Sequence, residues 1–320
     1  MLTILVSGAS GVIGYGILKS LRQSHPESRL IGISVYERSA ARAFCDVFEK
    51  APMTNHEGYI SWLVELIKQY NVSLAIPGIE VDVVAWSEHR ATIEQSEALV
   101  LLNNPELIRL CSDKWLFYQR LVENNSPYAI PTTLVFDEDL QQFPLLLKPR
   151  KGSGSQGITI VKNREGLQEH LADIGPKLMI QPVIGTAEEE YTTSAFFDLN
   201  SRLCAFSTLK RRLSQAGFTE SAETVEVDNI ENVLEHLGEI FMPAGPTNFQ
   251  FRVDNGQLKL LEINPRISSA TSIRTAFGYN ESAMSVEFYL RNITPTQPIL
   301  KRGYAIRYSE DIIYYDSTDF

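Results

Sequence analysis

The sequence predicts a protein of mixed α/β and α+β class, in which a doubly wound parallel sheet precedes two units built on antiparallel strands. Apolar strand patterns alternate with amphipathic helical patterns up to about residue 103. Two helical patterns then follow each other directly, and most segments after residue 183 show strand patterns in succession. We therefore expect units at residues 1–103, 104–182 and 183–320.

The first unit begins with a continuous apolar run at Leu2–Ser7, which is typical of a buried parallel strand. The glycine turn Gly8-x-x-Gly11-x-x-Gly14 leads from this strand into a helix expected at Val12–Gln23. The other elements expected in this unit are strands at Arg29–Val35, Val72–Ile76 and Ala98–Leu102, a helix at Tyr59–Tyr70 and a helix starting near Val81.

Two helices should open the second unit and end near Glu123, because Asn104-Pro105 places proline in a first turn and Ser112 is a candidate cap. The other elements expected there are strands at Thr133–Phe136, Leu145–Pro149, Ile158–Val161 and Lys177–Pro182, and a helix at Glu165–Leu171. The elements expected in the third unit are strands at Tyr191–Asp198, Leu203–Leu209, Thr224–Val227, Asn248–Val253, Leu258–Ile263 and Tyr304–Tyr315, and a helix at Ile230–Leu237. The turn Asp254-Asn255-Gly256 predicts a tight hairpin.

The composition narrows the class of function. The formal net charge of -10 disfavours non-specific binding to nucleic acid, which depends on Lys and Arg. No apolar run reaches the roughly 18 residues that span a membrane, and the N-terminus lacks the basic segment of a signal peptide. The three scattered cysteines indicate a reducing compartment. We expect a cytoplasmic protein that acts on small molecules.

The glycine turn by itself suggests a dinucleotide site. Glu37 lies 23 residues after Gly14, close to where a ribose-binding acid would be expected. The only Tyr-x-x-x-Lys pair, Tyr15 and Lys19, lies inside the first helix, where it would not serve a dehydrogenase. Close packing of the helix on the sheet, or binding of another anion at the helix N-terminus, explains the turn equally well.

A second glycine-rich loop follows the strand that carries Lys148. It contains Gly152, Ser153, Gly154, Ser155 and Gly157. Its backbone N–H groups are suited to phosphate oxygens, while Lys148 supplies a point charge. A flexible surface hairpin is the alternative interpretation.

The segment 248–272 carries the strongest signal for chemistry. Glu262 and Asn264 lie two residues apart on one strand and therefore on one face, and the hairpin turn brings Gln250 beside them. Oxygen donors on a rigid sheet suit Mg²⁺ with nucleotide phosphates, and Arg266 follows as a candidate anion contact. The alternative is a solvated polar face, although the strand is otherwise apolar.

A third stretch, at 179–198, joins Gln181-Pro182-Val183 to the acidic cluster Glu188–Glu190. The three stretches in this order resemble the ATP-grasp superfamily, and in particular its carbamoyl-phosphate synthetase-like branch of carboxylate–amine ligases. The resemblance covers nearly the whole chain. It implies an ATP-grasp fold with an N-terminal Rossmann-like sheet, a small α+β subdomain and a larger C-terminal subdomain.

The resemblance also implies roles for individual residues. It implies ATP as the nucleotide, with Mg²⁺, or Mn²⁺ in its place, held by Gln250, Glu262 and Asn264. Arg266 and Lys148 would act on the phosphates and the intermediate. The implied nucleotide-binding residues are Lys114, Lys148, Gly152, Ser153, Gly154, Ser155, Gly157, Gln181, Val183 and Glu190, with Glu188 or Glu189 as substitutes for Glu190.

The implied reaction is ATP-dependent coupling of a carboxylate to an amine through an acyl phosphate. A carboxy-phosphate-forming enzyme, an NAD(P)-dependent reductase and a non-catalytic nucleotide-binding module are the alternatives. Substrate contacts are expected from Gly11 in the glycine turn, from Glu80 and from one of Lys210, Arg211 and Arg212. Dimerisation is common in the family, so a homodimer is one option, and no nucleic-acid or membrane partner is expected.

Overall fold

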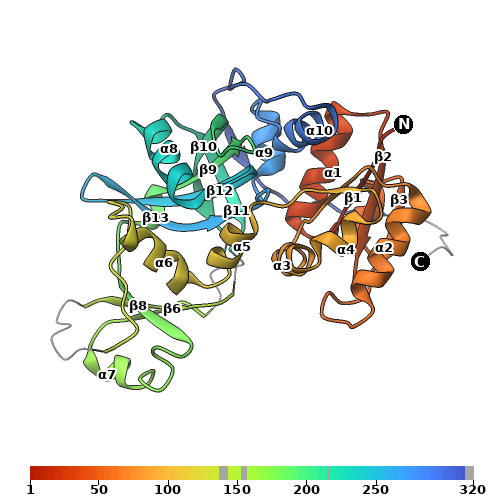
Figure 1. The fold of residues 1–320 in the computed structure, drawn as a ribbon. Helices are drawn as coiled ribbons and strands as arrows, with labels where there is room; N and C mark the ends of the chain where they lie inside the picture. The colour runs from red at the N-terminus through yellow and green to blue at the C-terminus, as the bar shows by residue number, and fades with distance from the viewer. Residues whose placement is uncertain (137–142, 153–156, 215–216, 314–320) are drawn as a thin grey trace.

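A parallel sheet of five strands forms the N-terminal part, in the order β3-β2-β1-β4-β5. The computed structural model describes residues 1–136, 143–152, 157–214 and 217–313 (Figure 1). The elements of this part are β1 (Thr3–Val6), α1 (Val12–Ser24), β2 (Arg29–Ser34), the 3-10 helix η1 (Ala40–Ala43), β3 (Val47–Lys50), α2 (Tyr59–Tyr70), β4 (Leu74–Ile76), α3 (Glu80–Glu88), α4 (Arg90–Glu94) and β5 (Leu99–Val100). The edge strand β3 was not predicted, because it is short and only partly buried.

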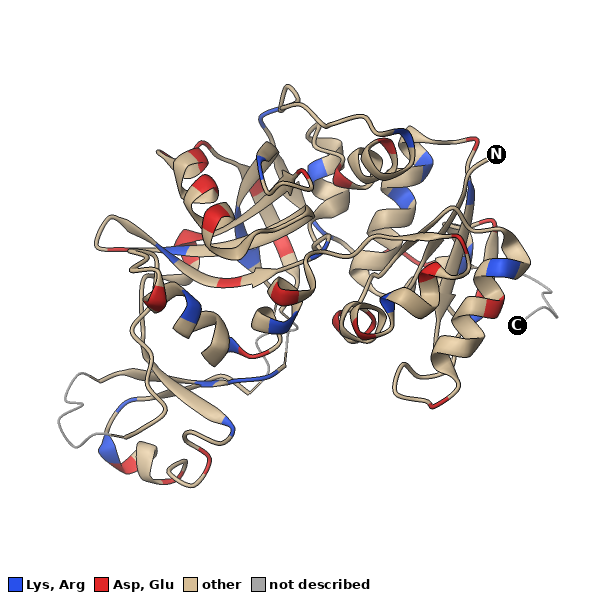
Figure 2. Ribbon diagram, viewed as in Figure 1, with Lys and Arg blue, Asp and Glu red and all other residues tan. Residues whose placement is uncertain are grey.

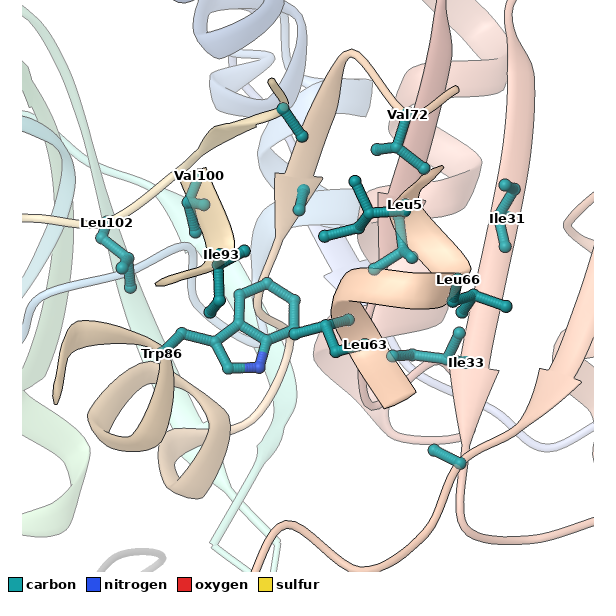
Figure 3. Packing of buried hydrophobic residues seen from close by; sticks show 14 of the residues in the cluster. Leu5, Ile31, Ile33, Leu63, Leu66, Val72, Trp86, Ile93, Val100 and Leu102 are labelled. Atoms are coloured by element: carbon teal, nitrogen blue, oxygen red, sulfur yellow. The ribbon is translucent and has the colours of Figure 1, made fainter. Parts of the chain in front are cut away.

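Apolar side chains from β1 and β2 and from α2, α3 and α4 pack together on one face of this sheet (Figure 3). Trp86 is fully buried there, and its Nε1 donates to the Tyr59 hydroxyl at 3.1 Å, which in turn donates to Asp82. The opposite face is covered by α1. Both faces are therefore buried, as the continuous apolar runs predict.

The glycine turn packs α1 closely against the sheet. A Cβ on Gly14 would lie 2.4 Å from the carbonyl oxygen of Gly8, which real structures do not tolerate. A Cβ on Gly78, which follows β4, would lie 2.2 Å from the carbonyl oxygen of Ser7 and 3.1 Å from the Cα of Gly14. These glycines therefore serve close backbone approach between neighbouring strand ends.

Two helices and a small sheet follow. They comprise α5 (Pro105–Cys111), α6 (Lys114–Glu123), β6 (Leu145–Pro149), β7 (Thr159–Val161), α7 (Arg164–Gln168) and β8 (Leu178–Pro182), with sheet order β7-β6-β8. The expected strand at Thr133–Phe136 was wrong, since Thr133 forms only an isolated bridge to Ile180. Ser112 was wrong as a cap, because its hydroxyl donates to the carbonyl of Arg109 and Asp113 caps α6 instead.

Asp113 should contribute to stability through both its hydrogen bonds and its charge. Its carboxylate accepts from the Trp115 N–H and pairs with Arg150 at 2.7 Å. Burial opposes ionisation, but these bonds outweigh it and lower the pKa of Asp113. We expect Asp113→Ala to cost about 1–2 kcal/mol in urea unfolding at pH 7.

The variant Asp113→Asn separates charge from capping. A lowered folded-state pKa stabilises the protein above the unfolded-state pKa of about 3.9, and this stabilisation is lost as the pH falls through the folded-state pKa. The deficit of Asp113→Asn should therefore be present at pH 7 and shrink below about pH 4. An equal deficit at pH 7 and pH 3 would contradict this.

The largest sheet has six strands in the order β13-β12-β9-β10-β11-β14, and lies between the small sheet and the N-terminal part (Figure 1). Its elements are the 3-10 helix η2 (Ala187–Glu189), β9 (Glu190–Phe197), β10 (Leu203–Leu213), β11 (Thr219–Thr224), α8 (Ile230–Phe241), β12 (Gly245–Asp254), β13 (Gln257–Asn264), α9 (Thr271–Ala276), α10 (Glu281–Arg291) and β14 (Tyr304–Ile306). The strand expected at Thr224–Val227 was placed too late, and α9 and α10 were not predicted. A closing strand was expected at Tyr304–Tyr315, but the strand β14 ends at Ile306, and residues 307–313 are not in a strand. Residues 314 and 315 of that expected strand lie outside the described residues.

The hairpin turn and a register shift together fix how β12 and β13 pair. Asn255 and Gly256 have φ angles of 50° and 77°, as a two-residue turn of this type requires. Beyond Phe251, which lies opposite Leu260, the register shifts by one residue, so Gln250 lies opposite Glu262 and not opposite Leu261. Phe249, Phe251 and other apolar residues of the alternate face pack against α8, so the polar residues face the opposite way.

Candidate nucleotide and substrate site

Two cavities meet beside β13. The smaller measures about 290 Å³ and lies between the small and large sheets, while the larger measures about 950 Å³ and extends towards the N-terminal sheet. Lys114, Gly152 and Glu262 line both of them. A ligand in one cavity would therefore meet a ligand in the other at Glu262.

The polar face of the hairpin supplies three oxygen-bearing side chains at this junction. Asn264 donates through its Nδ2 to Glu262 Oε1 at 3.1 Å, and Gln250 lies opposite Glu262 on β12. Gln250 and Glu262 line the smaller cavity, whereas Glu262 and Asn264 line the larger one. The structure thus brings together the three residues that the sequence grouped as metal ligands.

Two lysines balance the charge of Glu262. Burial by itself would raise the pKa of the Glu262 carboxyl, but Lys148 and Lys114 outweigh it, so this pKa is lowered. Burial likewise lowers the pKa of Lys148, against the opposing effect of Glu262. Lys148 is 8% exposed and donates to the carbonyl of Leu261 at 3.3 Å. A half-buried carboxylate close to two lysines is a charge arrangement suited to a phosphate–metal complex.

Glu190 is held by two arginines in the smaller cavity. Its Oε1 accepts from Arg211 at 2.9 Å and its Oε2 accepts from Arg252 at 3.0 Å. Arg211 also donates to Gln250 Oε1 at 2.7 Å. Glu190 lines the cavity, but both of its oxygens are engaged by these arginines.

The other residues that the sequence predicted for a nucleotide site come from the small sheet and α6. Gln181 and Val183 line the smaller cavity, and Gln181 Nε2 donates to the Thr132 hydroxyl at 2.9 Å. Lys114 Nζ donates to the carbonyl of Gly152 at 2.5 Å. Gly157 has a φ of 72°, whereas the expected loop residues Ser153, Gly154 and Ser155 lie outside the described residues.

Arg266 joins the hairpin to the N-terminal part. Its Nε donates to Glu80 at 2.9 Å and its Nη2 donates to Asn264 Oδ1 at 3.0 Å. Glu80 and Asn264 both line the larger cavity. The predicted catalytic arginine and the predicted substrate contact Glu80 are therefore neighbours.

The glycine turn is not part of either cavity lining. None of the residues from Gly8 to Gly14 lines the two cavities, so Gly11 is not brought to the other predicted site residues. Glu37, which the dinucleotide interpretation needs, is exposed and pairs with Lys50 at 3.0 Å.

Sequence reasoning missed Arg252 and Cys111. Arg252 lies two residues beyond Gln250 on the same strand, so its place on the polar face could have been inferred from the period of two. Cys111 ends α5 and lines the larger cavity, and burial raises the pKa of its thiol well above the usual range. No local signal marks this cysteine.

The chain is similar in structure to several solved enzymes. N5-carboxyaminoimidazole synthetase from Staphylococcus aureus, complexed with ADP, superposes with a TM-score of 0.73 at 16% identity, over 93% of this chain and 80% of that one. Biotin carboxylase from Campylobacter jejuni superposes with a TM-score of 0.73 at 16% identity, over 94% of this chain and 74% of that one. L-amino acid ligase from Bacillus licheniformis superposes with a TM-score of 0.70 at 13% identity, over 91% of this chain and 74% of that one. At these identities the likeness establishes the fold.

The sequence comparisons agree with this fold. Residues 176–312 match the family model described as "ATP-grasp in the biosynthetic pathway with Ter operon". The carbamoyl phosphate synthase large chain of Methanothrix thermoacetophila is 23% identical over 212 residues, which is 58% of this chain and 19% of that protein. The carbamoyl phosphate synthase large chain of Brucella suis is 22% identical over 225 residues, which is 55% of this chain and 18% of that protein. The matched part of the chain therefore spans about a fifth of the length of these relatives.

The candidate site consists of two cavities that share one carboxylate, that of Glu262. The chain has the ATP-grasp fold, residues 176–312 match an ATP-grasp family model, and the sequence is similar to carbamoyl phosphate synthase large chains. Within the described residues, no helix is both long and apolar enough to traverse a lipid bilayer.

Proposed function

We propose that the protein is an ATP- and Mg²⁺-dependent ligase that activates a carboxylate and couples it to an amine, with release of ADP and phosphate. The observation that carries this proposal is the meeting of two cavities at Glu262. One cavity has the lysines and hinge residues suited to a nucleotide, and the other has the volume of a small-molecule site. A transfer reaction between two ligands requires such contact.

ATP occupies the smaller cavity in this proposal. Lys148 and Lys114 neutralise its phosphates, and the backbone of Gln181 and Val183 contacts the adenine. Glu190 acts mainly through Arg211 and Arg252, because its oxygens are already engaged by them. Glu190 would contact the ribose once the arginines turn to the phosphates, whereas the alternatives Glu188 and Glu189 do not line the smaller cavity.

The metal-ligand set fits Mg²⁺, which is held by hard oxygen donors and keeps several waters. The ionised carboxylate of Glu262 stands with the amide oxygens of Gln250 and Asn264. These amide oxygens accept from Arg211 and Arg266 respectively, so both arginines would have to turn away for the metal to bind. Mg²⁺, when bound there, would neutralise charge on the transferring phosphoryl group. Mn²⁺ is an acceptable substitute for such a donor set.

The reaction proceeds by two substitutions. A carboxylate oxygen attacks the γ-phosphorus of ATP, and the bond to the β-phosphate oxygen breaks, giving acyl phosphate and ADP. The amine nitrogen then attacks the acyl carbon, the carbon–oxygen bond to phosphate breaks, and phosphate and a proton leave. Lys148 and Arg266 stabilise the negative charge, and the protein's main contribution is to position the reactants.

An assay of ADP release distinguishes this function from its main rival. A ligase should release ADP only when both a carboxylate and an amine are present, or much faster with both. Bicarbonate-dependent release without an added carboxylate would support the carboxy-phosphate alternative. Mass spectrometry of the product identifies the coupled pair.

We expect Mg-ATP, and not NADH, to raise the melting temperature. At about 100 times its Kd, a ligand that binds only the folded state stabilises it by about 2.7 kcal/mol. This corresponds to a shift of several degrees for a chain of this size. Lys148→Met should abolish most of the shift, whereas Lys259→Met, which changes a half-buried lysine of β13 outside both cavity linings, should retain it. Stabilisation by NADH alone would contradict the proposal.

The proposal also includes the domain division, the cellular compartment and the oligomeric state. The division at residues 103/104 and 182/183 is supported by the three sheets, which fall on either side of these positions. We infer a cytoplasmic protein from its scattered free cysteines. A homodimer remains an option that gel filtration would test.

A further inference from the structure

The larger cavity has one Lys or Arg side chain, two histidines (His56 and His89) and several acidic side chains in its described lining. Its carboxylates are Glu57, Glu80, Glu88 and Glu262, and its one Lys or Arg is Lys114. Lys114 stands at the junction with the smaller cavity, which it also lines. The positive charge of the larger cavity is therefore placed at its nucleotide end.

The acidic residues differ in how far they are neutralised. Glu80 pairs with Arg266, and Glu262 is balanced by lysines. Glu57 and Glu88 are exposed, and within the described ranges neither forms an ion pair with Lys, Arg or His. Glu57 precedes α2 and Glu88 ends α3, so their unbalanced charge comes from two different elements. Figure 2 shows the acidic positions of α3, which is seen nearly end-on.

Away from Lys114, the described lining offers an anionic ligand no Arg or Lys, and its only other basic side chains are His56 and His89, which precede or follow a glutamate of the same lining. Phosphate sites in proteins use Arg, Lys or a helix N-terminus. The N-terminus of α3 lies at this cavity, but its first turn already carries Glu80 and Asp82. These carboxylates offset the positive end of the helix dipole.

The cavity wall is apolar between the charged groups. Its apolar members are Met53, Ile60, Val81, Val84, Ala85 and Phe117. Met53 is 61% exposed and Val81 is 57% exposed, which is high for such side chains. Exposed apolar residues gathered on one cavity wall are typical of a surface that a ligand covers.

We propose that the amine substrate bound in the larger cavity is cationic, has an apolar body and carries no phosphate group. This inference rests on the proposed function only in making that ligand the acceptor of the acyl group. The carboxylate substrate lies at the Lys114 end, next to the nucleotide. The positive charge of the amine lies near Glu57 and Glu88, and its carbon chain contacts the apolar wall.

A series of five-carbon amines with different end groups tests the class of substrate. The compounds are 1,5-diaminopentane, pentylamine, 5-aminopentanoate and 5-aminopentyl phosphate. Calorimetry on the full chain with Mg²⁺ and a non-hydrolysable ATP analogue measures binding without turnover. We expect the diamine to bind about tenfold or more tightly than the phosphate compound. The cavity carboxylates attract the second ammonium group of the diamine and repel the phosphate group.

Variants assign this preference to the two free carboxylates. Glu57→Gln and Glu88→Gln should each weaken diamine binding about two- to fivefold, the range of partly exposed ion pairs, and leave pentylamine less affected. Glu88→Lys should reverse the preference towards 5-aminopentanoate. The matched control is Glu239→Gln on α8, an exposed acid on the opposite side of the large sheet, which should change nothing. The acidic positions of α8 are visible in Figure 2.

The binding and turnover measurements can contradict the two proposals independently of each other. Selective diamine binding without ADP release for any carboxylate would overturn the ligase function and leave the inferred cavity chemistry intact. ADP release with anionic or phosphorylated amines preferred would overturn the inference and leave the ligase function intact. Absence of binding by all four amines at millimolar concentration would also overturn the inference.

Discussion

Replacing Glu262 with glutamine should reduce ADP release by about 100-fold or more, since the loss of about 3 kcal/mol of transition-state stabilisation has this effect. The substitution keeps the side chain's shape but removes the one carboxylate that both cavities share. The positive charges of Lys148 and Lys114 then repel each other, because the carboxylate that balanced them is gone. Steady-state ADP release over a range of Mg²⁺ concentrations measures the effect, and the variant should need more Mg²⁺.

Controls separate this effect from unfolding. Glu239→Gln changes an exposed acid and should retain wild-type turnover. Asn264→Ala removes a neighbouring amide and should give a smaller loss, because the carboxylate remains. Turnover of Glu262→Gln within threefold of the wild type, with an unchanged Mg²⁺ requirement, would contradict the assignment of Glu262 as a metal ligand.

Replacing Arg274 with methionine should destabilise the protein by about 3–5 kcal/mol, the usual cost of breaking a buried charge pair. Arg274 is fully buried behind the polar face of the large sheet, and it lies 3.7 Å from the equally buried Glu281. It donates to Asn248 Oδ1 at 3.0 Å and to Ser268 at 2.6 Å. Urea unfolding at pH 7 measures the loss.

A double variant identifies the cause of that loss. Arg274→Met leaves Glu281 buried without its cation, whereas Arg274→Met with Glu281→Leu removes both charges and should recover part of the stability. The matched control is Arg291→Met on α10, whose exposed pair with Glu287 should contribute less than about 1 kcal/mol. Equal urea midpoints for Arg274→Met and Arg291→Met would contradict a structural role for the buried pair.

Patterns with strong local causes were confirmed in the structure. The helix at Tyr59–Tyr70 and the strand at Leu145–Pro149 have the predicted bounds, because their apolar spacing and their ends are marked in the sequence. The hairpin of β12 and β13 was confirmed with the predicted turn. In each case neighbouring residues determine the conformation.

Elements whose stability comes from distant contacts were missed. Helix α9 has only six residues and four of them are polar or charged, so it shows no apolar stripe, yet Thr271 and Arg274 are buried. Its N-terminal half packs against α1, where a Cβ on Gly16 would lie 2.9 Å from Thr271. Buried polar residues of this kind resemble surface residues until the opposite element is known.

The sequence by itself determined that Glu262 and Asn264 share one face, because side chains alternate along a strand. The register shift between Gln250 and Phe251, which only the tertiary structure decided, brings Gln250 to the same face. Only the tertiary structure decided that Glu190 would be neutralised by Arg211 and Arg252, and that Arg266 would reach Glu80 from 186 residues away. These contacts join elements that no local rule relates. The ionisation of each site residue depends on its charged neighbours, and these neighbours come from separate sheets that pack together.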